Sequence, residues 1–140
     1  MNSINQLRSV HDSFDGYGAS AMKDVHKSVT RNGRPYGGTG FVFNKRFSPF
    51  LRPELCYEGE RMTVMKLLDA DYDVFIINVY FPFRRNGDEH RVEYLELLGS
   101  IENVIVSNPA AKFIVVGDFN YNIWDSLLLQ LLIAFSKIMI

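Results

Sequence analysis

Short apolar runs alternate along the chain with polar connections that contain glycine or proline, which is typical of a domain built around a sheet. Runs rich in strand-forming residues predict strands at residues 61–68, 72–81 and 112–117, and a shorter strand at residues 41–43. Residues 72–81 are apolar at nearly every position, so we expect this strand to be central and buried. We expect residues 112–117 to form a second buried strand.

One segment has the period of a helix, at residues 88–107. Asp88 can cap its start, and Asn108 with Pro109 closes it. A strand, a helix and a strand joined by short connections predict a layered α/β fold. The expected apolar face consists of Val92, Leu95, Leu98, Ile101, Val104 and Ile105.

The first part of the chain carries weaker patterns. We expect a short helix at the start that breaks at Asp15-Gly16 and at Gly18, and a loop at residues 47–59. Glycines at residues 37–40 allow a close backbone approach before the strand at 41–43. They are not a dinucleotide-binding loop, because the glycine spacing differs and no helix follows.

The last stretch, residues 124–140, is mostly apolar with a few polar interruptions. Its 17 residues are short for a bilayer span, which needs about 20, so we expect no membrane span. Three interpretations remain open: a helix packed on the domain or on a partner, a chain end without its proper neighbour, or membrane association. Packing over an exposed sheet edge is one form of the first.

Composition restricts the class of protein. A chain of 140 residues with 47% hydrophobic residues can form one domain with a core. Its formal charge of −1 gives no overall attraction to nucleic acid or anionic lipid. The single Cys56 excludes an internal disulfide framework and a cysteine-rich metal site. Since no secretory signal opens the chain, we expect an intracellular protein, nuclear or cytoplasmic, that is not secreted.

Candidate chemistry follows the last predicted strand, where the chain reads GDFN. Alternation along a strand puts Asp118 and Asn120 on one face and Phe119 on the other, while Gly117 allows a close backbone approach. A carboxylate can hold a hard cation or take a proton from water, and an amide can orient water or a phosphate oxygen. Ordinary turn chemistry is the alternative interpretation.

A second polar group ends the other buried strand, where the chain reads NVYFP. The phenol of Tyr80 can hydrogen-bond a phosphate oxygen or a nucleophile. The alternative is an ordinary aromatic residue at a strand end. If the two strands finish side by side, then Tyr80, Asp118 and Asn120 converge on one pocket.

Taken together, these motifs resemble the endonuclease/exonuclease/phosphatase superfamily, in particular the apurinic-type endonuclease domains of non-long-terminal-repeat (LINE-type) retrotransposons. The resemblance extends over roughly residues 14–122, and four segments carry it in family order: GRPYGGTGFVFNK, ERMTVMKL, FIINVYFPF and FIVVGDFN. It implies a four-layer α/β sandwich, an α/β (α+β) fold, with a divalent cation, usually Mg²⁺, as cofactor and DNA as partner. It also implies that Tyr80 contacts the scissile phosphate, that Asp118 activates the attacking water, and that Asn120 positions water or phosphate.

Some family motifs are absent from this sequence: an opening strand that bears an asparagine, a following strand that ends in a metal-binding Gln-Glu pair, and a final Ser-Asp-His. We therefore expect residues 1–122 to form a partial domain with incomplete sheets, followed by an apolar helix at 123–140 that is not family-like. The expected function is a fragment of a metal-dependent DNA endonuclease, weakly active or inactive, from a truncated element or an imperfect gene model. The alternative is a non-catalytic remnant that binds nucleic acid or protein.

Other charged residues have less specific interpretations. We interpret Glu60 and Arg61 as surface or edge charges, and the alternative is that they pair with the missing half of the parent fold. Lys45, Arg84 and Arg85 are either plain surface charge or cations that follow a DNA backbone.

Overall fold

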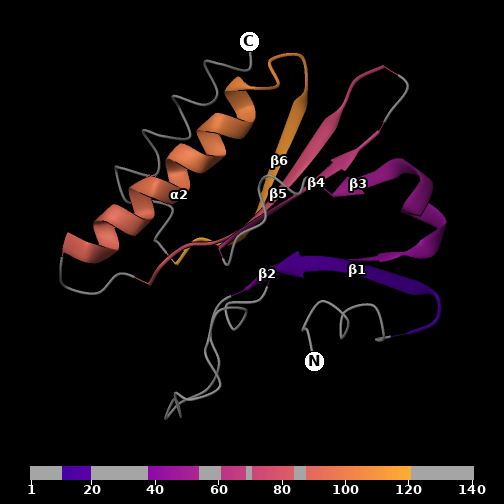
Figure 1. The fold of residues 1–140 in the computed structure, drawn as a ribbon, viewed down its shortest axis with the longest axis horizontal. Helices are drawn as coiled ribbons and strands as arrows, with labels where there is room; N and C mark the ends of the chain where they lie inside the picture. The colour runs from indigo at the N-terminus through magenta and orange to yellow at the C-terminus, as the bar shows by residue number, and fades with distance from the viewer. Residues whose placement is uncertain (1–10, 20–37, 54–60, 69–70, 84–87, 121–140) are drawn as a thin grey trace.

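In the part of the chain that it describes, the computed structural model shows two β-sheets and one long helix (Figure 1). It describes residues 11–19, 38–53, 61–68, 71–83 and 88–120. Residues 1–10 and 121–140 lie outside the described part of the chain, as do Arg84 and Arg85. The predictions for the chain start, for the apolar tail and for those two arginines therefore stay predictions.

The elements follow one another along the chain as strands, a 3₁₀ helix, strands, a helix and a last strand. They are β1 (Phe14–Ala19), β2 (Thr39–Asn44), η1 (Lys45–Phe50), β3 (Leu51–Pro53), β4 (Met62–Leu67), β5 (Val74–Tyr80), α2 (Asp88–Val106) and β6 (Lys112–Asp118).

The strands form a two-stranded sheet, β1-β2, and a four-stranded sheet in the order β3-β4-β5-β6. β5 and β6 are parallel, and the other pairs are antiparallel. A parallel pair needs a crossover connection, which α2 supplies between β5 and β6. The predicted strands in residues 61–68, 72–81 and 112–117 are confirmed, and β5 is central as expected because it pairs on both sides.

Three layers result, with the four-stranded sheet in the middle. One face of β5 buries Phe75, Ile77 and Val79 in the core that α2 completes. Asn78 points to the opposite face, where its side-chain Nδ2 donates to the carbonyl oxygen of Gly40 in β2 over 2.7 Å. The α/β class with two sheets is thus confirmed, and Figure 1 shows α2 and the β1-β2 pair on either side of the larger sheet.

The helix packs through a face that differs in part from the predicted one. Val92 and Leu95 were expected inside, but they are 54% and 48% exposed. At 100° per residue Val92 lies opposite the buried face and Leu95 on its flank. The buried positions are Tyr94, Leu97, Leu98, Ile101, Val104 and Ile105. Among the described residues, no helix is long and apolar enough to span a membrane.

The predicted burial of the last strand is wrong. β6 carries the apolar run as expected, yet Ile114, Val115 and Val116 are all exposed, Ile114 to 50%. β6 is at the edge of the described sheet, so only β5 pairs with it there. An apolar run indicates that a strand can be buried. Whether it is buried depends on how many strands and helices flank it.

Two other expectations need correction. The loop predicted at residues 47–59 contains most of η1 and all of β3, which pairs with β4. At Asp15-Gly16 and Gly18, where the expected helix was to end, the chain is not helical but forms β1, a strand that the sequence pattern did not predict. Its glycines are accommodated because β2 supplies backbone partners along the whole strand, including Gly40 opposite Gly18.

The bond between Asn78 and Gly40 gives a first testable prediction. Replacing Asn78 with alanine should lower the free energy of unfolding by about 1–3 kcal/mol, because the Gly40 carbonyl between the sheets loses its donor. Urea unfolding followed by circular dichroism measures this. The matched control is Asn103→Ala on the exposed side of α2, which should not destabilise the chain. Equal losses in both variants would contradict the role given to Asn78.

Candidate functional site

The carboxyl ends of β5 and β6 bring two of the three predicted site residues together. Tyr80 and Asp118 are register partners in this parallel pair. The backbone N–H of Phe81 donates to the carbonyl oxygen of Asp118 over 2.8 Å, so the two chains stay adjacent one residue further. Since side chains alternate along a strand, Tyr80 and Asp118 both project to the face to which Asn78 points. The expectation that the two strands end side by side is confirmed.

Asn120 forms hydrogen bonds to residues at the ends of both strands. Its backbone N–H donates to Oδ1 of Asp118 over 3.0 Å, and its side-chain Nδ2 donates to the carbonyl oxygen of Phe81 over 2.8 Å. Its φ of 48° is left-handed, a conformation that asparagine tolerates better than most residues. The turn chemistry considered as an alternative is therefore present, and it positions the Asp118 carboxylate. Among the described residues no hydrogen bond involves the amide Oδ1 of Asn120, so this oxygen can act as an acceptor.

Gly117 and Phe119 determine where these polar groups lie. Gly117 has a φ of 132°, and a Cβ there would lie only 1.9 Å from the carbonyl oxygen of Val79. The predicted close approach is thus confirmed. Phe119 packs on the core as predicted, with its ring stacked on that of Phe81 at a centroid distance of 5.5 Å. With Phe119 on the core side, Asp118 is left exposed at the strand end.

Arg61 also lies at this end of the sheet, where it is a partly exposed charge that contacts both Tyr80 and Glu93. Its carbonyl oxygen accepts the backbone N–H of Tyr80 over 2.9 Å. Its guanidinium carbon lies 5.7 Å from the centroid of the Tyr80 ring. The relevant signal is the β4-β5 register, in which Met62 opposes Val79 and thus puts Arg61 beside Tyr80. The register between β4 and β5 cannot be predicted from a single sequence.

The described residues do not by themselves make a metal site. Within the described ranges, no three His, Cys, Asp or Glu side chains are grouped so that they could hold an ion. Asp118 offers one exposed carboxylate. Magnesium sites in proteins commonly combine one or two carboxylates with substrate phosphates and waters. Asp118 could therefore serve as one ligand of an ion that is held mainly by other groups.

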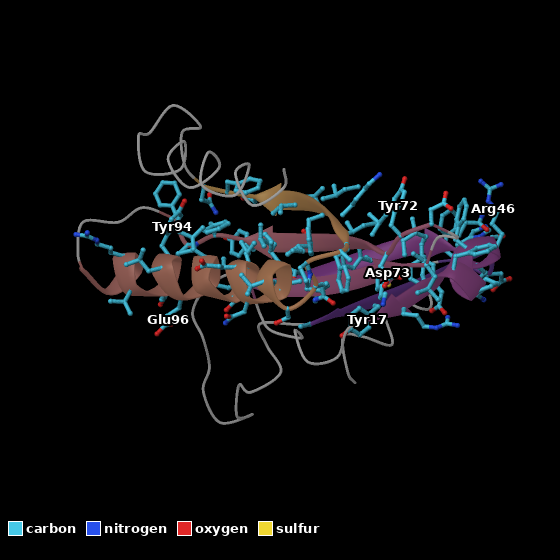
Figure 2. The ribbon with its side chains drawn as sticks, turned by 90° about the horizontal axis from the view of Figure 1, so that it is seen from above. Tyr17, Arg46, Tyr72, Asp73, Tyr94 and Glu96 are labelled. Carbon is cyan, nitrogen blue, oxygen red and sulfur yellow. The ribbon has the colours of Figure 1, made fainter. Side chains whose placement is uncertain are left out.

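A cavity of about 420 Å³ lies at the other end of the sheet. Asp71, Tyr72 and Asp73 line it before β5 begins, together with residues 108–111 before β6 begins. Figure 2 shows Tyr72 and Asp73 far from Tyr94, whose ring contacts that of Phe81 at 4.7 Å near the candidate site. The cavity is therefore no part of the candidate site.

No family model and no curated protein matches this chain. Among solved structures, it is similar to the endonuclease domain of TRAS1, a telomere-specific non-LTR retrotransposon, with a TM-score of 0.59 and 14% identity over 92% of this chain and 54% of that one. It is also similar to TDP2 from C. elegans, with a TM-score of 0.48 and 16% identity over 85% of this chain and 34% of that one. The human Nocturnin catalytic domain gives a TM-score of 0.49 and 15% identity over 84% of this chain and 47% of that one.

The match to the TRAS1 domain concerns the fold, since identity is only 14%. The chain spans about half of that domain, 54% of its length. The two sheets and the helix between β5 and β6 are consistent with part of the layered α/β fold that the sequence motifs implied, and the described residues form three of its four expected layers. The chain therefore adopts part of the endonuclease/exonuclease/phosphatase-type fold, as found in a non-LTR retrotransposon endonuclease.

Proposed function

We propose that this chain is a fragment of a divalent-metal-dependent phosphodiesterase, a DNA endonuclease of the retrotransposon type, with weak or no activity as it stands. One observation carries the proposal: Tyr80 and Asp118 are register partners at the carboxyl ends of two adjacent parallel strands. Ligand sites in α/β sheets commonly lie at such strand ends. The likeness to the TRAS1 endonuclease domain supports the same class of reaction.

Each of the three residues has a proposed role that suits its contacts. Asp118 would take the proton from the attacking water, and its Oδ1 is already oriented by the backbone N–H of Asn120. Asn120 would accept a hydrogen bond from that water through its amide oxygen, because Nδ2 is bonded to Phe81. The phenol O–H of Tyr80 would donate a hydrogen bond to a phosphate oxygen.

Magnesium is part of this proposal because the family that the sequence resembles uses a divalent cation. It would neutralise charge on the phosphate. Among the described site residues, the exposed carboxylate of Asp118 is the side chain that would bind the ion. DNA is the proposed substrate for the same family reason, and the three residues by themselves select only a phosphodiester.

Metal removal tests the proposal directly. Purified chain incubated with supercoiled plasmid and Mg²⁺ should produce nicked circles slowly, and EDTA should stop the reaction until Mg²⁺ is restored. Gel electrophoresis of the plasmid forms measures the rate. Nicking that continues in EDTA would contradict the proposal, and a complete absence of nicking at high protein concentration would favour the second candidate described below.

The second candidate is a non-catalytic module that contacts another macromolecule. The exposed apolar side chains of β6, Ile114, Val115 and Val116, favour it, because such surface commonly marks a contact site. The plasmid assay separates the two candidates. Absence of cleavage together with DNA binding that weakens as salt rises would support a nucleic-acid-binding remnant. Absence of both would leave a protein contact.

A further inference from the structure

Arg61 connects three parts of the molecule at the candidate site. It immediately precedes β4, its backbone pairs with the last residue of β5, and its side chain reaches α2. Its Nη2 lies 3.2 Å from Oε2 of Glu93, and its Nη1 lies 3.5 Å from the carbonyl oxygen of Tyr80. Arg61 thus contacts Tyr80 with both its backbone and its side chain.

The contacts of Arg61 restrict Tyr80 in two ways. The backbone bond of 2.9 Å from Tyr80 N–H to the Arg61 carbonyl fixes the end of β5 against the start of β4. The guanidinium carbon at 5.7 Å from the ring centroid is within the range of a cation–π contact, which favours one orientation of the phenol ring. Arg61 therefore acts on the ring as well as on the backbone.

Glu93 determines where the guanidinium lies. Arginine has many rotamers, and an ion pair through one guanidinium nitrogen favours those that point toward α2. The side chains of Arg61 and Glu93 are 30% and 46% exposed, so this pair contributes little to overall stability. Its effect is orientation: without Glu93 the guanidinium can move away from the Tyr80 ring.

We propose that Arg61 is a positioning residue for the phenol of Tyr80, and that Glu93 on α2 holds Arg61 in place for this purpose. The inference rests on the proposed function in one respect: the expected effect of a correctly placed phenol is its hydrogen bond to the phosphate. The positioning itself is a property of the folded chain and is measurable without a substrate. Neither Arg61 nor Glu93 is required to touch substrate.

The test uses the full chain with 3-fluorotyrosine incorporated, followed by ¹⁹F NMR. The chain has 7 tyrosines, so a Tyr80→Phe sample identifies the Tyr80 resonance. Arg61→Gln and Glu93→Gln should each shift or broaden that resonance. Arg61→Lys, which keeps the charge but not the planar fork, should restore it in part. The matched control is Arg91→Gln on α2, an exposed arginine that loses the same charge and should leave the Tyr80 resonance unchanged.

Stability and cleavage complete the test. Glu93→Gln should leave the thermal unfolding midpoint almost unchanged while it changes the Tyr80 resonance, a combination that a merely structural ion pair would not produce. Where nicking is measurable, Arg61→Gln should slow it by about 10- to 100-fold, as expected for a misplaced contact group. If the chain does not cleave DNA, the non-catalytic candidate function is favoured, while the ¹⁹F result still decides the positioning role.

Two results would overturn the inference. One is a Tyr80 resonance that remains at its wild-type position and width in Glu93→Gln, which decides the matter even if Arg61→Gln does not fold. The other is an Arg91→Gln sample that changes the resonance as much as the two test variants do, because the effect would then reflect net charge alone.

Discussion

Replacing Asp118 with asparagine is expected to lower the rate of Mg²⁺-dependent plasmid nicking by about 10²- to 10⁴-fold, the usual contribution of a positioned general base. The substitution removes the carboxylate that would take the proton from water. It keeps an oxygen at the position that accepts the backbone N–H of Asn120, so the turn after β6 should be preserved. The loss should therefore reflect chemistry and not folding.

The matched control for this variant is Asp71→Asn. Asp71 is exposed and lies before the start of β5, at the opposite end of the sheet. It loses the same charge and should nick plasmid at the wild-type rate. Cleavage that persists in Asp118→Asn would mean that the activity comes from another site or from a contaminating nuclease, and the role proposed for Asp118 would be abandoned.

The second large effect concerns stability and is expected at Gly117. Alanine there should lower the free energy of unfolding by about 3 kcal/mol or more, at the upper end of backbone strain effects, because two costs combine. The backbone has a φ of 132°, which side-chain-bearing residues rarely adopt. The added Cβ would also lie 1.9 Å from the Val79 carbonyl oxygen, so β5 and β6 must separate or Gly117 must change its conformation.

Gly99→Ala is the matched control for Gly117→Ala, and it should change the free energy of unfolding in the opposite direction. Gly99 lies within α2, and apart from its chain neighbours and the nearby backbone of its own helix, no heavy atom would lie within 4 Å of a Cβ added there. In a helix interior alanine is more favourable than glycine by about 1 kcal/mol, so Gly99→Ala should stabilise the chain. Urea unfolding of the two variants measures both effects. A Gly117→Ala variant as stable as wild type would show that the close approach of β5 and β6 is not required in solution.

The sequence alone determined the elements that depend on local pattern. The apolar runs at β4, β5 and β6 and the helical period of α2 predicted these elements closely, because periodicity is written directly in neighbouring residues. The placement of Phe119 against the core and of Asp118 on the opposite face followed from alternation along one strand. The motifs around Tyr80 and Asp118 further indicated the fold family.

Only the tertiary structure decided which residues lie beside those motifs. The burial of β6 depends on how many strands flank it, and the buried face of α2 depends on how the helix is rotated against the sheet. Arg61 became part of the candidate site because the β4-β5 register puts it beside Tyr80 and because α2 presents Glu93 to it. These are contacts between segments that are distant in sequence, and local pattern carries no record of register or rotation.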